Sequence, residues 1–252
     1  MRKVLHFPST KTLRERIIMA AGQSILDIES RAEARSAINS PGAVISDRMY
    51  NLVMGAVTAW GLLVNVVMCV TCSKMAVAVV AGNPLLFGIA YLVLAIAGVF
   101  IAHKSHNPII SFVGYNMIVI PLGLEISAMV ALYGGMNAVW VQNAFAYTLF
   151  ISAIMICASL LVPQFFQKIG RVLFACLIGL MVLGVVVALL GGGTLWLSYG
   201  AAVIFSLYIG FDFWKSQQYA KTVDNAVDSA VDLYLDIALL FLQLLRIFSN
   251  NR

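Results

Sequence analysis

Charged side chains are scarce in this sequence. Asp, Glu, Lys and Arg make up 11% of its 252 residues, whereas soluble domains carry about 25% charged residues. Hydrophobic residues reach 62%, and apolar runs of about eighteen residues or more recur from Tyr50 to the C-terminus with almost no polar linker between them. So little charge excludes a chain of ordinary soluble domains, and we expect one integral-membrane domain surrounded by a lipid bilayer.

The motifs of the common soluble enzymes are absent as well. The sequence has no Walker loop, no Gly-x-Gly-x-x-Gly turn between a strand and a helix, no His-Glu-x-x-His and no nucleophile elbow. The four cysteines all lie in or beside apolar runs, which argues against a secreted disulfide framework. Cys69 and Cys72 have C-x-x-C spacing without a second pair or a histidine cluster. We therefore expect free thiols, no cofactor and no enzymatic activity.

The basic residues point to membrane orientation and not to nucleic acid. The formal net charge is +5, but half of the 16 Lys and Arg residues lie in the first 48 residues and the others are spread between the apolar runs. Most of them fall on one side of the predicted spans, including Lys104, Lys168, Arg171, Lys215 and Lys221. The positive-inside rule then predicts a cytoplasmic N-terminus and an external C-terminus.

The first 48 residues differ from the remainder. They alternate basic and acidic groups around one short apolar stretch, Ile17 to Leu26, and show no clean small-residue cleavage site, so a signal peptide is not expected. We predict a cytoplasmic N-terminal extension over residues 1–48, either an amphipathic helix or a loose tail, and a membrane domain over residues 49–252. The absence of a retention motif and the compact size favour a bacterial inner membrane.

The apolar runs predict an all-α, polytopic bundle of seven transmembrane helices. Their continuous apolar character excludes the alternating strands of a membrane β-barrel, and each approaches the roughly 20 residues that cross a bilayer core. The predicted spans are Tyr50 to Cys72, Leu85 to His103, Ile109 to Tyr133, Ala144 to Val162, Val172 to Leu190, Leu195 to Trp214, and Val231 to Phe248.

Three carboxylates, Glu125, Asp212 and Asp236, fall inside predicted spans. Each costs at least roughly 2.5–3.5 kcal/mol in a bilayer core and needs a partner, water or a proton. Asp212 ends the sixth span and Asp236 lies about six residues, or ~9 Å, into the seventh, so both occupy the cytoplasmic half. Helices joined by a short loop are usually neighbours. The two carboxyl groups are therefore predicted to face each other, share a proton near neutral pH and act as a pH sensor.

Three further aspartates precede Asp236 along the chain. Asp224, Asp228, Asp232 and Asp236 follow one another at intervals of four residues, which makes a partly continuous acidic stripe on a helix. Such a stripe attracts cations to the inner mouth of an ion pathway. For Asp224 and Asp228 a role as solvated loop or cap residues is the simpler interpretation.

Glu125 and His103 each allow two interpretations. Glu125 follows Pro121, whose helix position frees a backbone carbonyl that can join a polar pathway; a protonated or hydrogen-bonded carboxyl is the alternative. His103 ends the second span at the depth of the aspartates, where it is either a counter-charge to them or only a boundary residue.

The C-terminal third contains a specific stretch, Leu-Tyr-Leu-Asp at residues 233–236, followed by Leu240-Phe241 and Leu244-Leu245-Arg246. On these residues it resembles the Bax inhibitor 1 family, also called the transmembrane Bax-inhibitor-motif family. Phe205 to Ile209 before Asp212, and Ala144-Phe145 with Thr148, are also similar to the family. The resemblance covers roughly Arg48 to the C-terminus.

This resemblance implies six helices around a central seventh and a proton-regulated calcium leak. The family's two aspartates correspond to Asp212 and Asp236. In some bacterial members an arginine at the end of the second span latches onto the first aspartate; His103, followed by Lys104, stands at that position here. The family pattern assigns no role to Glu125.

Three hypotheses follow. The first is a pH-gated calcium or other cation leak, in which Asp212 and Asp236 bind calcium weakly and transiently, with Asp228, Asp232 and Glu125 along the pathway. The second is a regulator without transport of its own that binds other membrane proteins. The third, an intramembrane aspartyl protease, is disfavoured because neither aspartate lies in a Gly-x-Gly-Asp motif.

Overall fold

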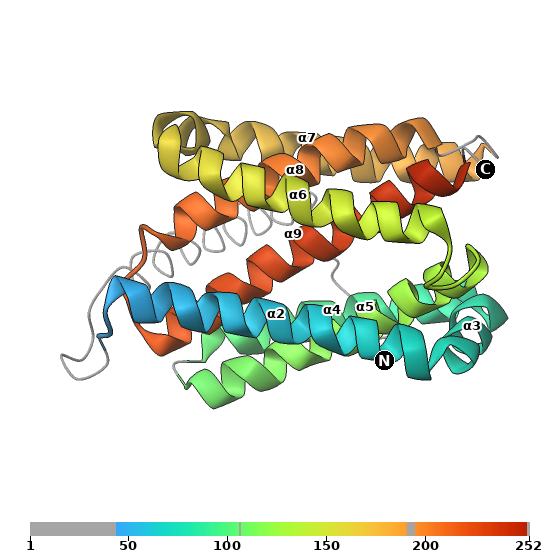
Figure 1. Cartoon of the computed structure of the whole chain (residues 1–252), viewed down its shortest axis with the longest axis horizontal. Coiled ribbons are helices and arrows are strands. Elements are labelled where there is room, and N and C mark those ends of the chain that lie inside the picture. Colours follow the sequence, from blue (N-terminus) through green and yellow to red (C-terminus); the bar gives the residue numbers. More distant parts are fainter. Residues whose placement is uncertain (1–43, 106, 191–194, 251–252) are drawn as a thin grey trace, which may run out of the picture. The chain divides into compact units, whose positions relative to one another are not determined.

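The computed structural model describes residues 44–105, 107–190 and 195–250. These residues form eight α-helices (Figure 1) and, apart from one isolated antiparallel bridge between Val44 and Thr222, no β-structure. The helices are α2 (Asp47–Thr71), α3 (Ser73–Gly82), α4 (Pro84–Lys104), α5 (Pro108–Leu132), α6 (Val139–Leu161), α7 (Pro163–Leu189), α8 (Leu195–Ser216) and α9 (Val223–Asn250). The predicted all-α class is confirmed. The predicted extension falls almost entirely on residues 1–43, which lie outside the described residues.

Six of these helices, α2 and α4 to α8, are long and apolar enough to cross a membrane. α9 has the required length, but Asp224, Asp228, Asp232, Asp236 and Arg246 make it more polar than the other long helices. The protein is thus an integral-membrane protein with six helices that meet both criteria, and the seventh span stays a prediction.

Capping residues define several helix ends. Asn83 and Asn107 precede the prolines that open α4 and α5, and their side chains accept hydrogen bonds from the amides of Leu86 (3.1 Å) and Ile109 (2.9 Å). Proline fits the first helical position because its missing N–H has no intrahelical partner there. An asparagine cap followed by proline therefore starts both α4 and α5.

α7 and α9 begin well before the apolar runs suggested, α6 begins at Val139 and not Ala144, and one helix was not predicted. α7 starts at Pro163 and not Val172, and α9 starts at Val223 and not Val231, because polar residues extend both helices beyond their apolar segments. The short helix α3 fills the segment after the first span. Asp228 is consequently inside α9 and only 2% exposed, so its interpretation as a solvated loop residue is wrong.

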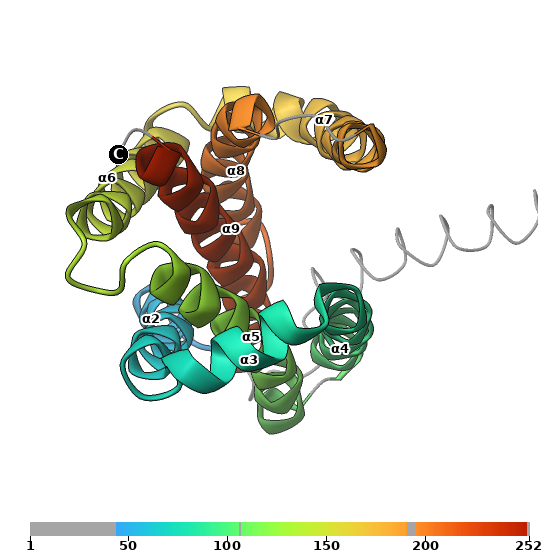
Figure 2. The same cartoon turned by 90° about the vertical axis from the view of Figure 1, so that its right-hand side faces the viewer.

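α9 is the helix most deeply enclosed by the others. It packs against α2, α4, α5, α6 and α8 and has more buried residues than any other described helix. Figure 2 shows it passing between α6 and α8 on one side and α2 and α5 on the other. In contrast, α4 and α7 leave most of their apolar surface exposed, as expected for helices facing lipid.

Aromatic and small residues fix α2 and α5 against α9. The rings of Tyr115 on α5 and Tyr234 on α9 meet edge to face, with centroids 5.3 Å apart. The Tyr115 hydroxyl donates a hydrogen bond to the Val57 carbonyl (3.0 Å), and the Asn65 side chain donates one to the Tyr234 hydroxyl (2.8 Å). Both rings lie directly against Gly61, where a Cβ atom has no room. These contacts hold α9 in a defined rotation.

Candidate functional site: a carboxylate cluster beside a cavity

Asp212 and Asp236 lie together, as expected from their positions on consecutive helices. Asp212 is close to the C-terminal end of α8 and its side chain is 12% exposed; Asp236 lies in the middle of α9 and is 7% exposed. Their carboxyl groups are close neighbours on the wall of one cavity. Two adjacent carboxylates in an apolar site repel each other when both are ionised, which favours a form with one shared proton.

Two basic side chains surround the pair, together with a third aspartate. The Lys215 ammonium lies 3.8 Å from Asp212 Oδ1 and 3.9 Å from Asp232 Oδ2, and so bridges α8 and α9. The His103 Nε2 atom lies 3.4 Å from Asp232 Oδ1. Lys104, in contrast, places its ammonium over the Phe100 ring, 5.2 Å from the centroid. His103 thus contacts Asp232, and the ammonium 3.8 Å from Asp212 belongs to Lys215.

Lys215 was not singled out from the sequence, although a signal for it exists. It follows Asp212 by three residues on a helix, which places the two side chains on the same face. The basic residue at the end of a span was interpreted only as a marker of orientation. Its contact with Asp232 depends on how α8 and α9 are aligned, and the sequence does not define that alignment.

A cavity of about 430 Å³ lies beside these carboxylates, between α7, α8 and α9. Asp212, Asp232 and Asp236 are its acidic lining residues, and Tyr208 is a further polar one. The rest of the wall is largely apolar: Leu177, Leu180, Met181, Phe205, Leu235, Leu239 and Gln243 complete it. A space with three acidic side chains in an apolar surrounding is suited to a cation and its waters.

Asp228 and Glu125, also predicted along the ion pathway, lie elsewhere. Neither lines this cavity. Asp228 is buried within α9, and Glu125 on α5 pairs with Arg246 near the other end of α9, at 4.0 Å between Oε1 and Nη2. This ion pair gives an intramembrane carboxylate the partner that it needs. The structure therefore groups Asp212, Asp232 and Asp236 into one carboxylate cluster, and separates Glu125 from them.

We expect the Glu125–Arg246 pair to contribute modestly to stability. Arg246 is 37% exposed, so solvent screening limits the coupling to about 0.5–1 kcal/mol. A double-mutant cycle of Glu125→Gln and Arg246→Gln, followed by unfolding in mixed micelles, measures this coupling free energy. A matched cycle of Glu125→Gln with Lys104→Gln has no expected coupling. Equal couplings in the two cycles would contradict the pairing.

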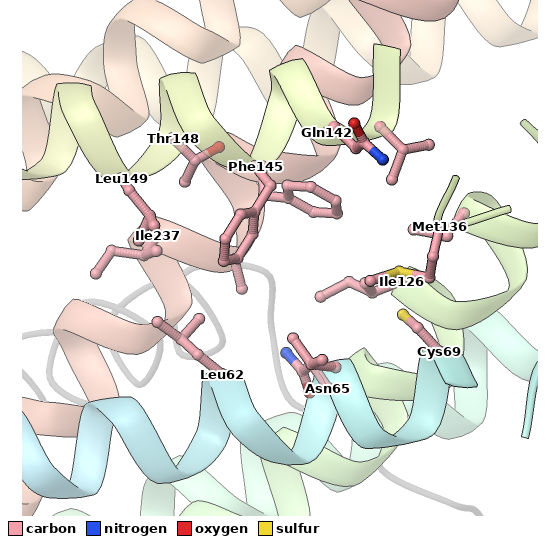
Figure 3. A pocket seen from close by; sticks show the side chains of 15 residues that line it. Leu62, Asn65, Cys69, Ile126, Met136, Gln142, Phe145, Thr148, Leu149 and Ile237 are labelled. Carbon is pink, nitrogen blue, oxygen red and sulfur yellow. The ribbon is translucent and has the colours of Figure 1, made fainter. Parts of the chain in front are cut away.

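A second cavity, of about 180 Å³, is of a different kind (Figure 3). It lies between α2, α5, α6 and α9, and Leu62, Ile126, Phe145 and Ile237 are among the apolar side chains that point into it. Asn65, Gln142 and Thr148 are uncharged, and no acidic or basic residue lines it. A cation has no counter-charge there.

No group of three or more His, Cys, Asp or Glu side chains able to hold a metal ion occurs within the described parts of the chain. Only two residues, Asp212 and Asp236, are predicted to bind calcium. Tight calcium sites use about six to eight oxygen ligands. The arrangement fits transient contact with a hydrated cation better than a resident metal.

Comparison with known proteins places these features in a family. The family model described as "Inhibitor of apoptosis-promoting Bax1" matches residues 43–252. Two proteins of Helicobacter pylori described as uncharacterized, from strains J99 and 26695, are 32% and 31% identical to this chain over 129 residues. That segment covers 49% of this chain and 54% of each relative, so the chain spans about half the length of the curated relatives it matches. The family match covers α2 to α9 and every residue of the carboxylate cluster. This chain therefore belongs to the Bax inhibitor 1 family.

Proposed function

We propose that the protein is a pH-sensitive leak for calcium, or for cations more generally, gated by Asp212 and Asp236. The observation that carries this proposal is that two carboxyl groups from adjacent helices, those of Asp212 and Asp236, meet on the wall of one cavity. A proton shared by such a pair removes one of its negative charges, so the charge of the site depends directly on pH.

The gating mechanism follows from the charge of the pair. At low pH one proton joins Asp212 to Asp236 and holds α8 against α9. At higher pH the second carboxyl ionises, the two negative charges repel each other, and the Lys215 ammonium balances only one of the three aspartate charges. Repulsion weakens the contact between α8 and α9, and the exposed carboxylates attract a cation. The leak rate is therefore expected to rise with pH.

Calcium suits the ligands, although the site binds it weakly. Carboxylate oxygens are hard ligands of the type calcium prefers. Because conduction requires that an ion enter and leave quickly, a small ligand set favours a leak over storage. The same argument admits other hard cations, which a selectivity measurement separates from calcium.

The topology is part of this proposal. α9 is a seventh span, at the centre of the bundle, because its polar residues face protein and cavity and its enclosure by five helices keeps them from lipid. The N-terminus lies in the cytoplasm by the positive-inside rule, and the membrane is a bacterial inner membrane, consistent with the bacterial relatives. The protein has no enzymatic activity in this proposal.

Calcium flux into proteoliposomes tests the leak. Purified full-length protein is reconstituted, and the uptake rate is followed from about pH 6 to about pH 8, where carboxyl pairs in apolar sites titrate. We expect uptake above that of protein-free liposomes, rising with pH. Uptake equal to that of empty liposomes at every pH would reject the proposal.

A regulator without transport is the second candidate, and one structural feature favours it. The described chain starts with Val44, which pairs with Thr222, and the Ile45 amide donates a hydrogen bond to the Lys221 carbonyl at 2.7 Å. The Lys221 ammonium also lies over the Tyr50 ring, 4.4 Å from its centroid. The last residues of the predicted extension are thus attached to the α8–α9 connection, and a partner that binds the extension gains a direct mechanical link to both aspartate-bearing helices.

Deleting residues 1–43 separates the two candidates. We expect the truncated protein to retain its calcium leak and pH dependence, because every residue of the carboxylate cluster and its cavity lies between His103 and Gln243. The readout is the same proteoliposome assay. A leak that vanishes in a truncated protein of unchanged thermal stability would show that transport requires the extension, whereas no uptake by either protein would favour the regulator.

A further inference from the structure

The face of α9 that carries the aspartates continues toward the other end of the helix. Asp232, Asp236, Leu239, Gln243 and Arg246 follow one another at steps of three or four residues, which places them on one face. Gln243 is the polar side chain between Asp236 and Arg246 on this helix. It lies seven residues beyond Asp236, or ~10 Å along the helix axis, and three residues, or ~5 Å, before Arg246.

A further cavity of about 330 Å³ occupies the space along this part of the face. Ser198 on α8 and Arg246 on α9 are among the residues that line it. It shares Leu180 and Gln243 with the cavity beside the aspartates. The two cavities therefore meet between one apolar side chain from α7 and one carboxamide from α9.

We propose that Gln243 is the polar contact at the constriction of a water-filled passage that joins these two cavities, and that permeating cations pass it. The inference rests on the proposed leak and extends it to a specific residue. Leu180 offers no ligand, so the Gln243 carboxamide supplies the oxygen that replaces part of the ion's water shell at this point. The Gln243 side chain lies between the carboxylates and the Arg246 end of α9.

The charges on either side agree with a neutral residue at the junction. Asp212, Asp232 and Asp236 attract cations into the first cavity. Arg246 lines the second cavity, and its positive charge is offset by Glu125 at 4.0 Å. A neutral carboxamide provides a ligand without trapping the ion and without drawing Arg246 away from Glu125.

Cysteine accessibility tests the passage without relying on flux. In full-length protein whose Cys69, Cys72, Cys157 and Cys176 are replaced by alanine, Gln243→Cys is exposed in liposomes to a membrane-impermeant, positively charged thiol reagent. We expect this cysteine to react. The control is Leu242→Cys, which is only 2% exposed and lines neither cavity, and is expected to stay unmodified. An unreactive Gln243→Cys overturns the proposal, since lipid chains and not water would then fill the junction.

Flux in the otherwise wild-type protein tests the role of the carboxamide. Gln243→Leu keeps a similar volume but removes the ligand, and we expect calcium uptake to fall about tenfold or more at every pH, with an unchanged midpoint of the pH profile. Gln142→Leu is the matched control, because that glutamine lines the separate uncharged cavity. Uptake by Gln243→Leu equal to wild type overturns the proposal.

The two assays distinguish a failure of this inference from a failure of the leak proposal. If the wild type carries no calcium but Gln243→Cys reacts, the passage is supported and the leak proposal is rejected. If the wild type carries calcium and Gln243→Cys is inert, the leak stands and ions take another route.

Discussion

Asp236→Asn and Asp212→Asn are each expected to abolish the pH dependence of calcium uptake and to lower the rate at about pH 8 roughly tenfold, a shift of about 1.4 kcal/mol. The asparagine amide is neutral and donates a hydrogen bond to the remaining carboxylate, so it imitates the protonated member of the pair at every pH. α8 and α9 then stay together when the solution becomes alkaline. The measurement is initial calcium uptake into proteoliposomes across the pH range.

Asp224→Asn is the matched control for these variants. Asp224 is on the same helix as Asp236 but lines neither cavity between α7, α8 and α9, and it hydrogen-bonds to Ser111. We expect this variant to keep the wild-type pH profile. Profiles of Asp212→Asn and Asp236→Asn that follow the wild type would show that the sensor lies elsewhere.

Gly114→Leu is expected to destabilise the protein by roughly 3 kcal/mol, because it overpacks a contact between two helix backbones. A Cβ atom on Gly114 lies 2.7 Å from the Gly98 carbonyl oxygen and 2.7 Å from the Ala102 amide nitrogen on α4. Backbone atoms have no rotamer with which to move aside, so α4 and α5 must separate. Thermal unfolding in detergent measures the loss.

The same substitution at Gly88 provides the comparison. Gly88 lies on α4, like Gly98, but a Cβ atom there has no neighbour within 4 Å. Gly88→Leu is expected to be neutral or slightly stabilising, because leucine is a better helix former than glycine. Equal losses of stability in the two variants would mean that the α4–α5 contact does not depend on the absence of side chains at Gly98 and Gly114.

Much of the fold follows from continuous apolar runs and turn residues. α8 begins at the predicted residue, Leu195, and α4 and α5 begin at the prolines that follow Asn83 and Asn107. The proximity of Asp212 and Asp236 was also predictable, because a short connection forces α8 and α9 to be antiparallel neighbours. Local sequence carries this information in full.

Contacts between helices that are distant in the sequence were not predictable in the same way. The pairing of Glu125 with Arg246 joins α5 to α9, and the contact of His103 with Asp232 joins α4 to α9. Each depends on how far one helix is shifted and rotated relative to another. Side-chain packing determines that geometry, for example the fit of Tyr115 and Tyr234 around Gly61, and periodicity alone does not encode it. The polar first turns of α7 and α9 were missed because hydropathy marks the apolar segment and not the end of the helix.

The cavity beside Asp212 and Asp236 has one well-buried wall, α9, and one largely exposed wall, α7. The surrounding bilayer therefore influences the volume of this cavity. α9 is held by five helices, whereas α7 packs against α8 and more sparingly against α6. Only 6% of the most apolar segment of α7 is buried. Displacing α7 therefore breaks mainly its contacts with α8, and acyl chains against its outer face add to the resistance. Lipid thickness and lateral pressure then act on the cavity volume directly, so the stiffness of this wall belongs to the membrane as much as to the protein.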